Sequence, residues 1–271
     1  MLVALRSRRQ IAPFTMHRPA SVADALALRA EPGTSAFLAG GIDLIDWLKY
    51  GHPLDRVIRL DGIPGLADIA AEANALRIGA MATHAAIAAS PLIRDVLPDL
   101  AALWPAVANP RVRFTGTIGG NVMAGKADYD GLPALMALGA AAEVASGAYI
   151  GLDARNPEGL VTAFRIPEPA TLRLFADRSL RPALTLWLGL SEVNGQVRSL
   201  RIAVGMAHPR PVCVTLPLDL PRPSLRPAAA ELAADVARRL PDPASDGRAG
   251  ASYRRRMVEV LTRRILAGDS V

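Results

Sequence analysis

Two pairs of adjacent glycines constrain the fold of this chain more than any other feature. The first pair follows Ser35–Ala39, an apolar run typical of a short strand, and precedes Ile42–Lys49, whose apolar residues recur at helical spacing. The second pair lies within Thr117–Asn121. Adjacent glycines let the backbone turn tightly and approach a ligand, and a following helix N-terminus favours an anion. Each segment therefore suits a phosphate or pyrophosphate, or is a tight turn that binds nothing.

The residues around the glycines narrow the chemistry. Neither segment matches GxGxxG or GxxxxGK[ST], so the Rossmann and P-loop fingerprints are absent. Thr117 and Asn121 offer side-chain hydrogen bonds beside the second pair. Asp130 either accepts hydrogen bonds from ribose or ribityl hydroxyls or caps the apolar helix expected at Leu132–Gly139.

Composition excludes several classes of protein. The chain has 271 residues, 51% of them hydrophobic and 21% charged, which is typical of a soluble globular protein. Its single cysteine, Cys213, excludes a disulfide framework and any iron–sulfur cluster held by this chain alone. The four histidines are scattered without metal-ligand spacing, so no metal site is predicted. Cys213 and the three tryptophans, Trp47, Trp104 and Trp187, are expected in the core.

The net charge of +6 comes almost entirely from arginine, since Lys49 and Lys126 are the only lysines. Such a balance is compatible with nucleic acid, an anionic cofactor, an acidic partner or simple composition bias. Aromatic residues make up 4% and do not alternate with basic ones as in an RNA-binding sheet. The basic helix expected at Tyr253–Leu266 has one apolar side, formed by Tyr253, Met257, Val260, Leu261 and Ile265. Its other side presents either a solvated arginine face or a surface for an acidic partner.

The pattern along the chain predicts three parts, at residues 1–55, 56–170 and 171–271. The arginine-containing arm Met1–Gln10 lacks the features of a signal peptide, and no apolar run approaches the roughly 20 residues of a membrane helix. We therefore expect a cytoplasmic protein. The remaining expected elements are a helix capped by Ser21, strands at Arg56–Leu60, Leu66–Ala71 and Leu76–Gly79, a helix capped by Thr83, a proline-broken helix at Pro91–Ala108, a strand at Leu160–Ile166, strands at Ala183–Val193 and Val197–Met206 joined by a hairpin turn at Asn194-Gly195, a proline-rich linker at Pro217–Pro227 and a helix at Ala228–Leu240.

Taken together, Ala39–Leu44 and Thr117–Asn121 resemble the AGG-x-[DS]-L and [TS]-[IV]-GGN segments of a known family. That family is the FAD-binding medium subunit of the molybdenum hydroxylases, which includes the carbon monoxide dehydrogenase flavoprotein and the FAD domain of xanthine dehydrogenase. The resemblance runs from about Phe14 to the end of the chain. Further matching segments are His17–Ser21, Ile78–Ala80 with Thr83, Asp130 with Pro133–Leu135, Val161–Pro167, and Ser252–Arg255 with Leu261–Arg264.

The resemblance implies an α+β fold: a two-subdomain FAD-binding domain of the vanillyl-alcohol oxidase/PCMH type, followed by an antiparallel sheet with helices. It implies that Leu38, Ala39, Gly40, Gly41, Ile42, Asp43, Leu44, Thr117, Ile118, Gly119, Gly120 and Asn121 surround the FAD pyrophosphate. Asp130 would hold a ribose or ribityl hydroxyl, and Leu160 and Val161 would pack near the isoalloxazine. The segment Arg173–Arg181 would lie by the ring, with Arg173 or Arg178 as the basic residue there.

The implied function is electron transfer, without a catalytic acid–base pair in this chain, because the flavin carries the chemistry. A large molybdopterin-binding partner and a small partner with two [2Fe-2S] clusters would complete a dimer of heterotrimers. Electrons would pass through FAD to NAD⁺, oxygen or a quinone-side acceptor. A stand-alone FAD-dependent oxidoreductase and an assembly module without flavin are the alternatives. The hydroxylated substrate and the acceptor are not specified by this chain.

The chain also departs from the family. The segment between Val144 and Leu160 is shorter, which alters the expected access to the flavin ring. In the first glycine segment, Ile42 stands where Thr or His is common, so one side-chain contact is lost. The single cysteine excludes the additional iron–sulfur cluster that some relatives carry in this subunit.

Overall fold

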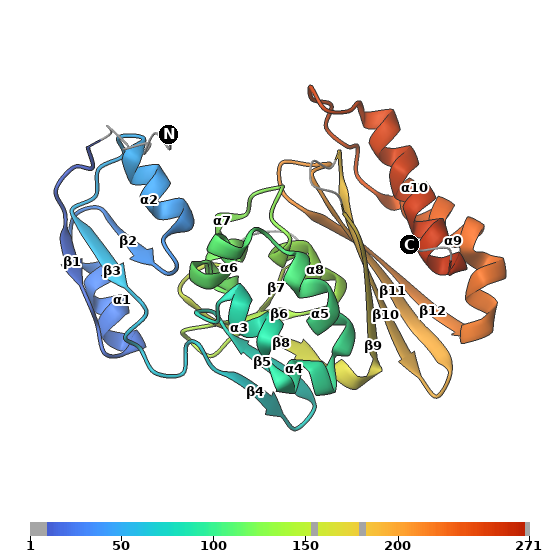
Figure 1. Ribbon diagram of the computed structural model, residues 1–271, viewed down its shortest axis with the longest axis horizontal. Coiled ribbons are helices and arrows are strands. Elements are labelled where there is room, and N and C mark those ends of the chain that lie inside the picture. Colours follow the sequence, from blue (N-terminus) through green and yellow to red (C-terminus); the bar gives the residue numbers. More distant parts are fainter. Residues whose placement is uncertain (1–9, 153–156, 179–182, 269–271) are drawn as a thin grey trace, which may run out of the picture.

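The computed structural model describes residues 10–152, 157–178 and 183–268. Three sheets follow one another along the chain and across the molecule, each with its own helices (Figure 1). This arrangement confirms the α+β class and the C-terminal antiparallel sheet with helices. Among the described residues, no helix is both long and apolar enough to span a membrane.

The N-terminal unit is a small parallel sheet with strand order β1-β3-β2 and two helices. Ser21 caps the first helix, as predicted, because its side chain accepts a hydrogen bond from the Asp24 amide at 3.1 Å. Strand β3 pairs with both neighbours, so this sheet includes residues beyond the expected boundary near residue 55. The elements are β1 (Thr15–His17), α1 (Val22–Ala30), β2 (Ser35–Leu38), α2 (Ile42–Lys49) and β3 (Arg56–Arg59).

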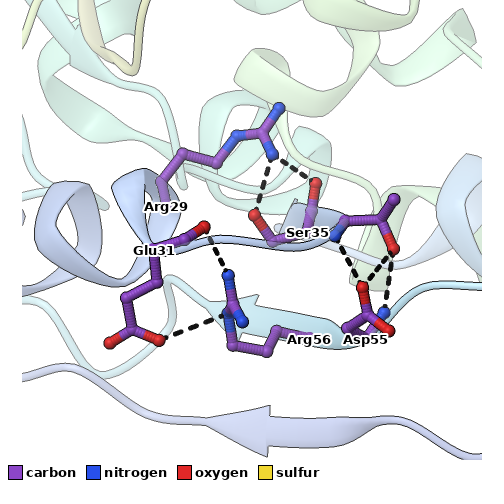
Figure 2. Close-up of polar contacts among 6 residues, drawn as sticks. Arg29, Glu31, Ser35, Asp55 and Arg56 are labelled. Atoms are coloured by element: carbon purple, nitrogen blue, oxygen red, sulfur yellow. Dashed lines mark hydrogen bonds and ion pairs between the residues drawn. The ribbon is translucent and has the colours of Figure 1, made fainter.

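A polar network fixes the start of β2, the strand that leads into the first glycine pair (Figure 2). Arg29 Nη1 donates to the Ser35 carbonyl at 2.6 Å and to its hydroxyl at 2.8 Å. Asp55 accepts from the Thr34 amide at 2.7 Å and hydroxyl at 2.9 Å, and these bonds lower the pKa of its carboxyl. Arg56 donates to the Glu31 carbonyl at 2.8 Å. The strand therefore enters the glycine segment in a defined direction.

The middle unit is a sheet of order β4-β5-β8-β6-β7 with helices against it. Pro91 and Pro98 each stand at the start of a helix, so the expected proline-broken helix becomes short successive ones. The strand expected at Leu66–Ala71 begins later, at Ile69. The elements are β4 (Ile69–Glu72), β5 (Ala75–Gly79), α3 (His84–Ala89), α4 (Pro91–Val96), α5 (Pro98–Leu103), η1 (Trp104–Ala106), α6 (Pro110–Thr115), α7 (Ile118–Ala124), α8 (Gly131–Ala137), β6 (Ala141–Val144), β7 (Tyr149–Gly151) and β8 (Val161–Pro167).

The C-terminal unit is an antiparallel sheet of order β12-β11-β10-β9, which lies between α8 on one side and two long helices on the other. Alternation along β10 serves both faces: Trp187 joins the core of the middle unit, whereas Leu186 and Leu188 pack with the helices. The elements are η2 (Pro169–Thr171), β9 (Leu172–Asp177), β10 (Thr185–Val193), β11 (Gln196–Gly205), β12 (Val212–Pro221), η3 (Arg222–Ser224), α9 (Leu225–Arg239) and α10 (Ala251–Ala267).

Three expectations about single segments were wrong. The proline-rich linker expected from Pro217 is, up to Pro221, part of β12, which tolerates proline because it is an edge strand. Trp47 was expected in the core but is 43% exposed and stacks on His52, with ring centroids 4.5 Å apart. Tyr253, expected on the apolar side of the last helix, is exposed, and Arg254 is buried there instead.

The third unit packs closely on the middle one. A Cβ atom on Gly189 of β10 would lie 1.9 Å from the Ala137 carbonyl oxygen, so α8 and β10 touch through their backbones. A second contact between the two units is the hydrogen bond that the Met206 amide donates to the Ala127 carbonyl at 2.9 Å. The loop that precedes α8 is thus held from the side of the C-terminal sheet.

Candidate functional site

The first glycine segment joins β2 to α2 through a backbone that excludes side chains. Gly41 is the N-cap of α2 and has φ = 76°, a left-handed conformation that favours glycine. A Cβ on Gly40 would lie 1.9 Å from the Thr115 carbonyl oxygen. Gly40 thus allows the N-terminal unit to touch the end of α6. Among the described residues no side chain caps α2, so its first amides are available to a ligand.

The second glycine segment is helical. Thr117 caps α7 by accepting a hydrogen bond from the Gly120 amide at 3.1 Å. The two glycines belong to the first turn of α7 rather than to a preceding loop, which corrects the expected turn. A Cβ on Gly119 would meet the Ala80 carbonyl at 2.7 Å, whereas one on Gly120 would point to Ala39, with 3.7 Å to its Cβ. Gly119 therefore serves packing, and Gly120 faces the first glycine segment.

The two segments together border a cavity of about 390 Å³. It lies where the N-terminal unit, the middle unit and the end of β9 meet. The lining residues are Phe37, Ala39, Gly40, Gly41, Ile42, Asp43, Leu44, His84, Val107, Ala108, Asn109, Val112, Gly116, Thr117, Gly120, Asn121, Met123, Ala124, Asp128, Tyr129, Asp130 and Arg178.

A polar cluster joins the two units at one edge of this cavity. Asp43 of α2 forms an ion pair with Lys126 and accepts a hydrogen bond from the Tyr129 hydroxyl at 2.9 Å. The Lys126 ammonium lies 5.3 Å from the centre of the Tyr129 ring. Burial, followed by the hydrogen bond to Asp43, raises the pKa of Tyr129 to about 12, so the phenol keeps its proton. Lys126 offsets the negative charge that Asp43 places beside the glycines.

Asp130 lies at the end of the loop that contains Lys126 and Tyr129, and it forms an ion pair with Arg178. Arg178 donates to its carboxylate through Nε at 3.1 Å and Nη2 at 2.5 Å. Burial raises the pKa of the Asp130 carboxyl, and the Arg178 guanidinium opposes this shift. Asp130 makes no capping bond to α8; instead, Asn121 Oδ1 accepts a hydrogen bond from the Gly131 amide at 3.0 Å.

Six of the predicted site residues do not line the cavity. Leu38 and Ile118 flank the glycine segments and pack into neighbouring cores, as Gly119 does against Ala80. Leu160 and Val161 are buried in two different cores. Arg173 pairs with Asp99, with Nε and Oδ2 2.7 Å apart, and its side chain is 52% exposed. Arg181 lies outside the described residues, as does part of the shortened segment before Leu160.

The cavity also contains residues that sequence reasoning missed. His84 is 1% exposed, and its Nδ1 has no hydrogen-bond partner within the described part of the chain. Burial and the nearby Arg113 charge lower the pKa of His84 to about 4, so the ring is neutral. Tyr129, which lines the cavity, and Lys126, which pairs with Asp43 at its edge, were missed as well. The rarity of lysine in this chain is the one signal that singles out Lys126.

The cavity has the features that a dinucleotide cofactor needs. The start of α2, where Gly41 is left-handed and no described side chain caps the helix, suits a diphosphate. Asp130 and Asn121 provide oxygen acceptors, and the apolar side chains of Phe37, Val107 and Val112 provide a surface for a ring. The fold and the site together define a dinucleotide-binding class of protein.

Comparisons with known proteins specify the family. A family model described as "FAD binding domain in molybdopterin dehydrogenase" matches residues 12–169. The carbon monoxide dehydrogenase medium chain of Afipia carboxidovorans is 33% identical over 93% of this chain and 94% of its own length. The nicotine 6-hydroxylase medium subunit of Paenarthrobacter nicotinovorans is 30% identical over 92% of this chain and 94% of its own.

A solved structure shows the same relationship in three dimensions. Reconstituted CO dehydrogenase from Oligotropha carboxidovorans contains a chain that is 28% identical, with a TM-score of 0.79 over 94% of this chain and 96% of that one. The chain therefore belongs to the FAD-binding medium subunits of the molybdenum hydroxylases, and FAD is its cofactor. The expected family, fold class and cofactor are confirmed.

Proposed function

We propose that this chain transfers electrons through FAD bound in the cavity between the two glycine segments. The chain would take electrons from the [2Fe-2S] clusters of a small partner subunit and pass them to an external acceptor. The observation that supports this proposal most directly is the cavity, which is lined by residues of both glycine segments, Asp130 and Arg178. The relatives named as medium chains and medium subunits support a place in a multi-subunit enzyme.

The residues of the chain would bind and orient the cofactor. The amides at Gly41–Leu44 and those near Gly120 would hold the diphosphate, with Lys126 neutralising Asp43 close by. Asp130 would accept a hydroxyl of the sugar chain, and Arg178 would keep that carboxylate ionised and in place. Bound FAD supplies the ability to accept and release electrons.

The clusters and the molybdenum centre belong to partner chains in this proposal. One cysteine cannot hold an iron–sulfur cluster that needs four protein ligands, so the clusters must lie elsewhere. A large molybdopterin-binding subunit would carry out the hydroxylation, and we propose a dimer of heterotrimers as the assembly. NAD⁺, oxygen and a quinone-side acceptor are the candidate electron acceptors.

Purification through an affinity tag on this chain, with the neighbouring genes co-expressed, tests the proposal. We expect two partner chains by mass spectrometry, visible flavin absorption, and molybdenum and iron by elemental analysis. Mass photometry gives the stoichiometry. A chain that purifies alone and oxidises a substrate by itself would favour a stand-alone flavoprotein. A colourless chain that takes up no added FAD would indicate an assembly module.

A further inference from the structure

The loop between η1 and α6 forms one wall of the cavity through Val107, Ala108 and Asn109. Ala108 has φ = 53°, in the left-handed region that side chains with a Cβ disfavour. Such a conformation persists only where surrounding contacts hold it.

Two arginines hold three successive carbonyl groups of the loop. Arg113 Nη1 donates to the carbonyl oxygens of Val107 and Ala108, both at 3.0 Å. Arg178 Nη1 donates to the carbonyl of Ala106, while its other nitrogens bind Asp130. The two guanidinium groups thus fix the loop on both sides of Val107.

Arg113 differs from Arg178 in its position. Arg178 lines the cavity, whereas Arg113 lies behind the loop on α6 and is not among the lining residues. Its hydrogen bonds to the described residues reach the loop carbonyls, and both of these carbonyls belong to residues that form the wall. The shape of that wall therefore depends on a side chain that does not border the cavity.

We propose that Arg113 is a positioning residue for FAD: it holds Ala108 in the left-handed conformation and so shapes the cavity wall for the cofactor. This inference rests on the proposal that FAD occupies this cavity. Removing Arg113 frees the loop to relax to a more common backbone conformation, so cofactor binding then has to restore the wall. The affinity for FAD falls as a result.

The test measures FAD affinity of the full chain by titration calorimetry for wild type, R113Q, R113K and R111Q. Arg111 is an exposed arginine on the same helix and does not line the cavity, so R111Q is the matched control for charge. We expect R113Q to weaken binding about tenfold, as for the loss of hydrogen bonds to a charged donor. R113K should lie within about threefold of wild type, because an ammonium group also donates to two carbonyls.

A double-mutant cycle with A108G separates positioning from a general effect on α6. Glycine adopts the left-handed conformation without a Cβ penalty. R113Q should therefore cost clearly less affinity in the A108G background than in wild type. The visible circular dichroism of bound flavin should change in R113Q and not in R111Q.

Two results would overturn the inference. One is that R113Q and R111Q bind FAD equally well; the other is that R113Q costs the same with and without A108G. Failure of the proposed cofactor site has a different signature. If G40A, which blocks the junction of the two glycine segments, binds FAD like wild type, the cavity is not the FAD site and the inference falls with it.

Discussion

The carboxylate of Asp130 and the guanidinium of Arg178 form a two-point ion pair across the boundary between the middle unit and the C-terminal sheet. The side chain of Asp130 is 7% exposed, and that of Arg178 is 24% exposed. Removing one partner of such a pair leaves a buried charge without its counterion. The pair thus couples the shape of the cavity to the packing of the two units.

R178Q should lower the free energy of unfolding by about 2 kcal/mol, less than for a fully buried pair because the guanidinium reaches solvent. R173Q is the matched control, since the Arg173–Asp99 pair lies at the surface and should contribute less than about 1 kcal/mol. Urea denaturation followed by circular dichroism measures both. If R178Q and R173Q lower the free energy of unfolding equally, the Arg178–Asp130 pair does not contribute more than a surface pair, and the expectation is wrong.

G40A should weaken FAD binding more than tenfold, an order-of-magnitude expectation for a forced backbone shift. The added Cβ would sit 1.9 Å from the Thr115 carbonyl oxygen, so the first glycine segment must move away from the end of α6, which leads into the second. Fluorescence titration with FAD measures the loss. G247A is the control, because a Cβ there meets nothing within 4 Å. The expectation fails if the two variants bind alike.

D43N should lower the pKa of Tyr129 below its value of about 12, because the variant removes the negative charge that accepts the Tyr129 hydrogen bond. Burial of the phenol remains, so the pKa stays above that of a free tyrosine. Alkaline titration of phenolate absorbance, compared with Y129F, isolates this residue. D46N, on the exposed side of the same helix, should leave the titration unchanged.

His84 should make the protein less stable as the pH falls from about 6.5 to about 4. The pKa of the buried ring is about 4, so over this interval the unfolded chain takes up a proton that the folded chain does not. The full effect is on the order of 3 kcal/mol, reached near pH 4 and absent above the unfolded pKa.

Urea denaturation between pH 4.5 and 7.5, a range of about three pH units chosen to span the shift, checks this expectation. H84Q should flatten the dependence of the unfolding free energy on pH, because the variant removes the buried ring whose pKa is lowered. A wild-type slope that survives in H84Q would show that other groups cause it.

The sequence patterns with a local physical cause predicted the fold well. The cap at Ser21, the cap at Thr83 and the hairpin at Asn194-Gly195 each depend on a few adjacent residues, and all three are observed. Helix α6, by contrast, has six residues and begins at a proline, so its pattern resembles a loop. The sequence did not show that the second glycine pair is helical. Gly119 is needed there because the helix packs closely on Ala80, which lies far away in the sequence.

The candidate site shows the same limit. The glycine segments and Asp130 could be found from short motifs, and the cavity brings them together. The sequence did not show whether Arg173 or Arg178 is the basic residue at the site, since the two arginines lie close together in the same segment. Tertiary contacts distinguish the two side chains: Arg173 pairs with Asp99 at the surface, whereas Arg178 pairs with Asp130 and lines the cavity. Likewise, nothing local indicates that Arg113 reaches back to the loop before α6.

The family model ends at residue 169, yet the loop from Ala127 to Asp130 is held by Arg178 and Met206 from beyond that point. A fragment cut at this boundary would keep both glycine segments but would lose the counterion of a buried carboxylate. The cofactor-binding half of this protein is therefore not a transplantable module. Any chimera that joins it to the C-terminal domain of a relative must bring matching contacts for that loop.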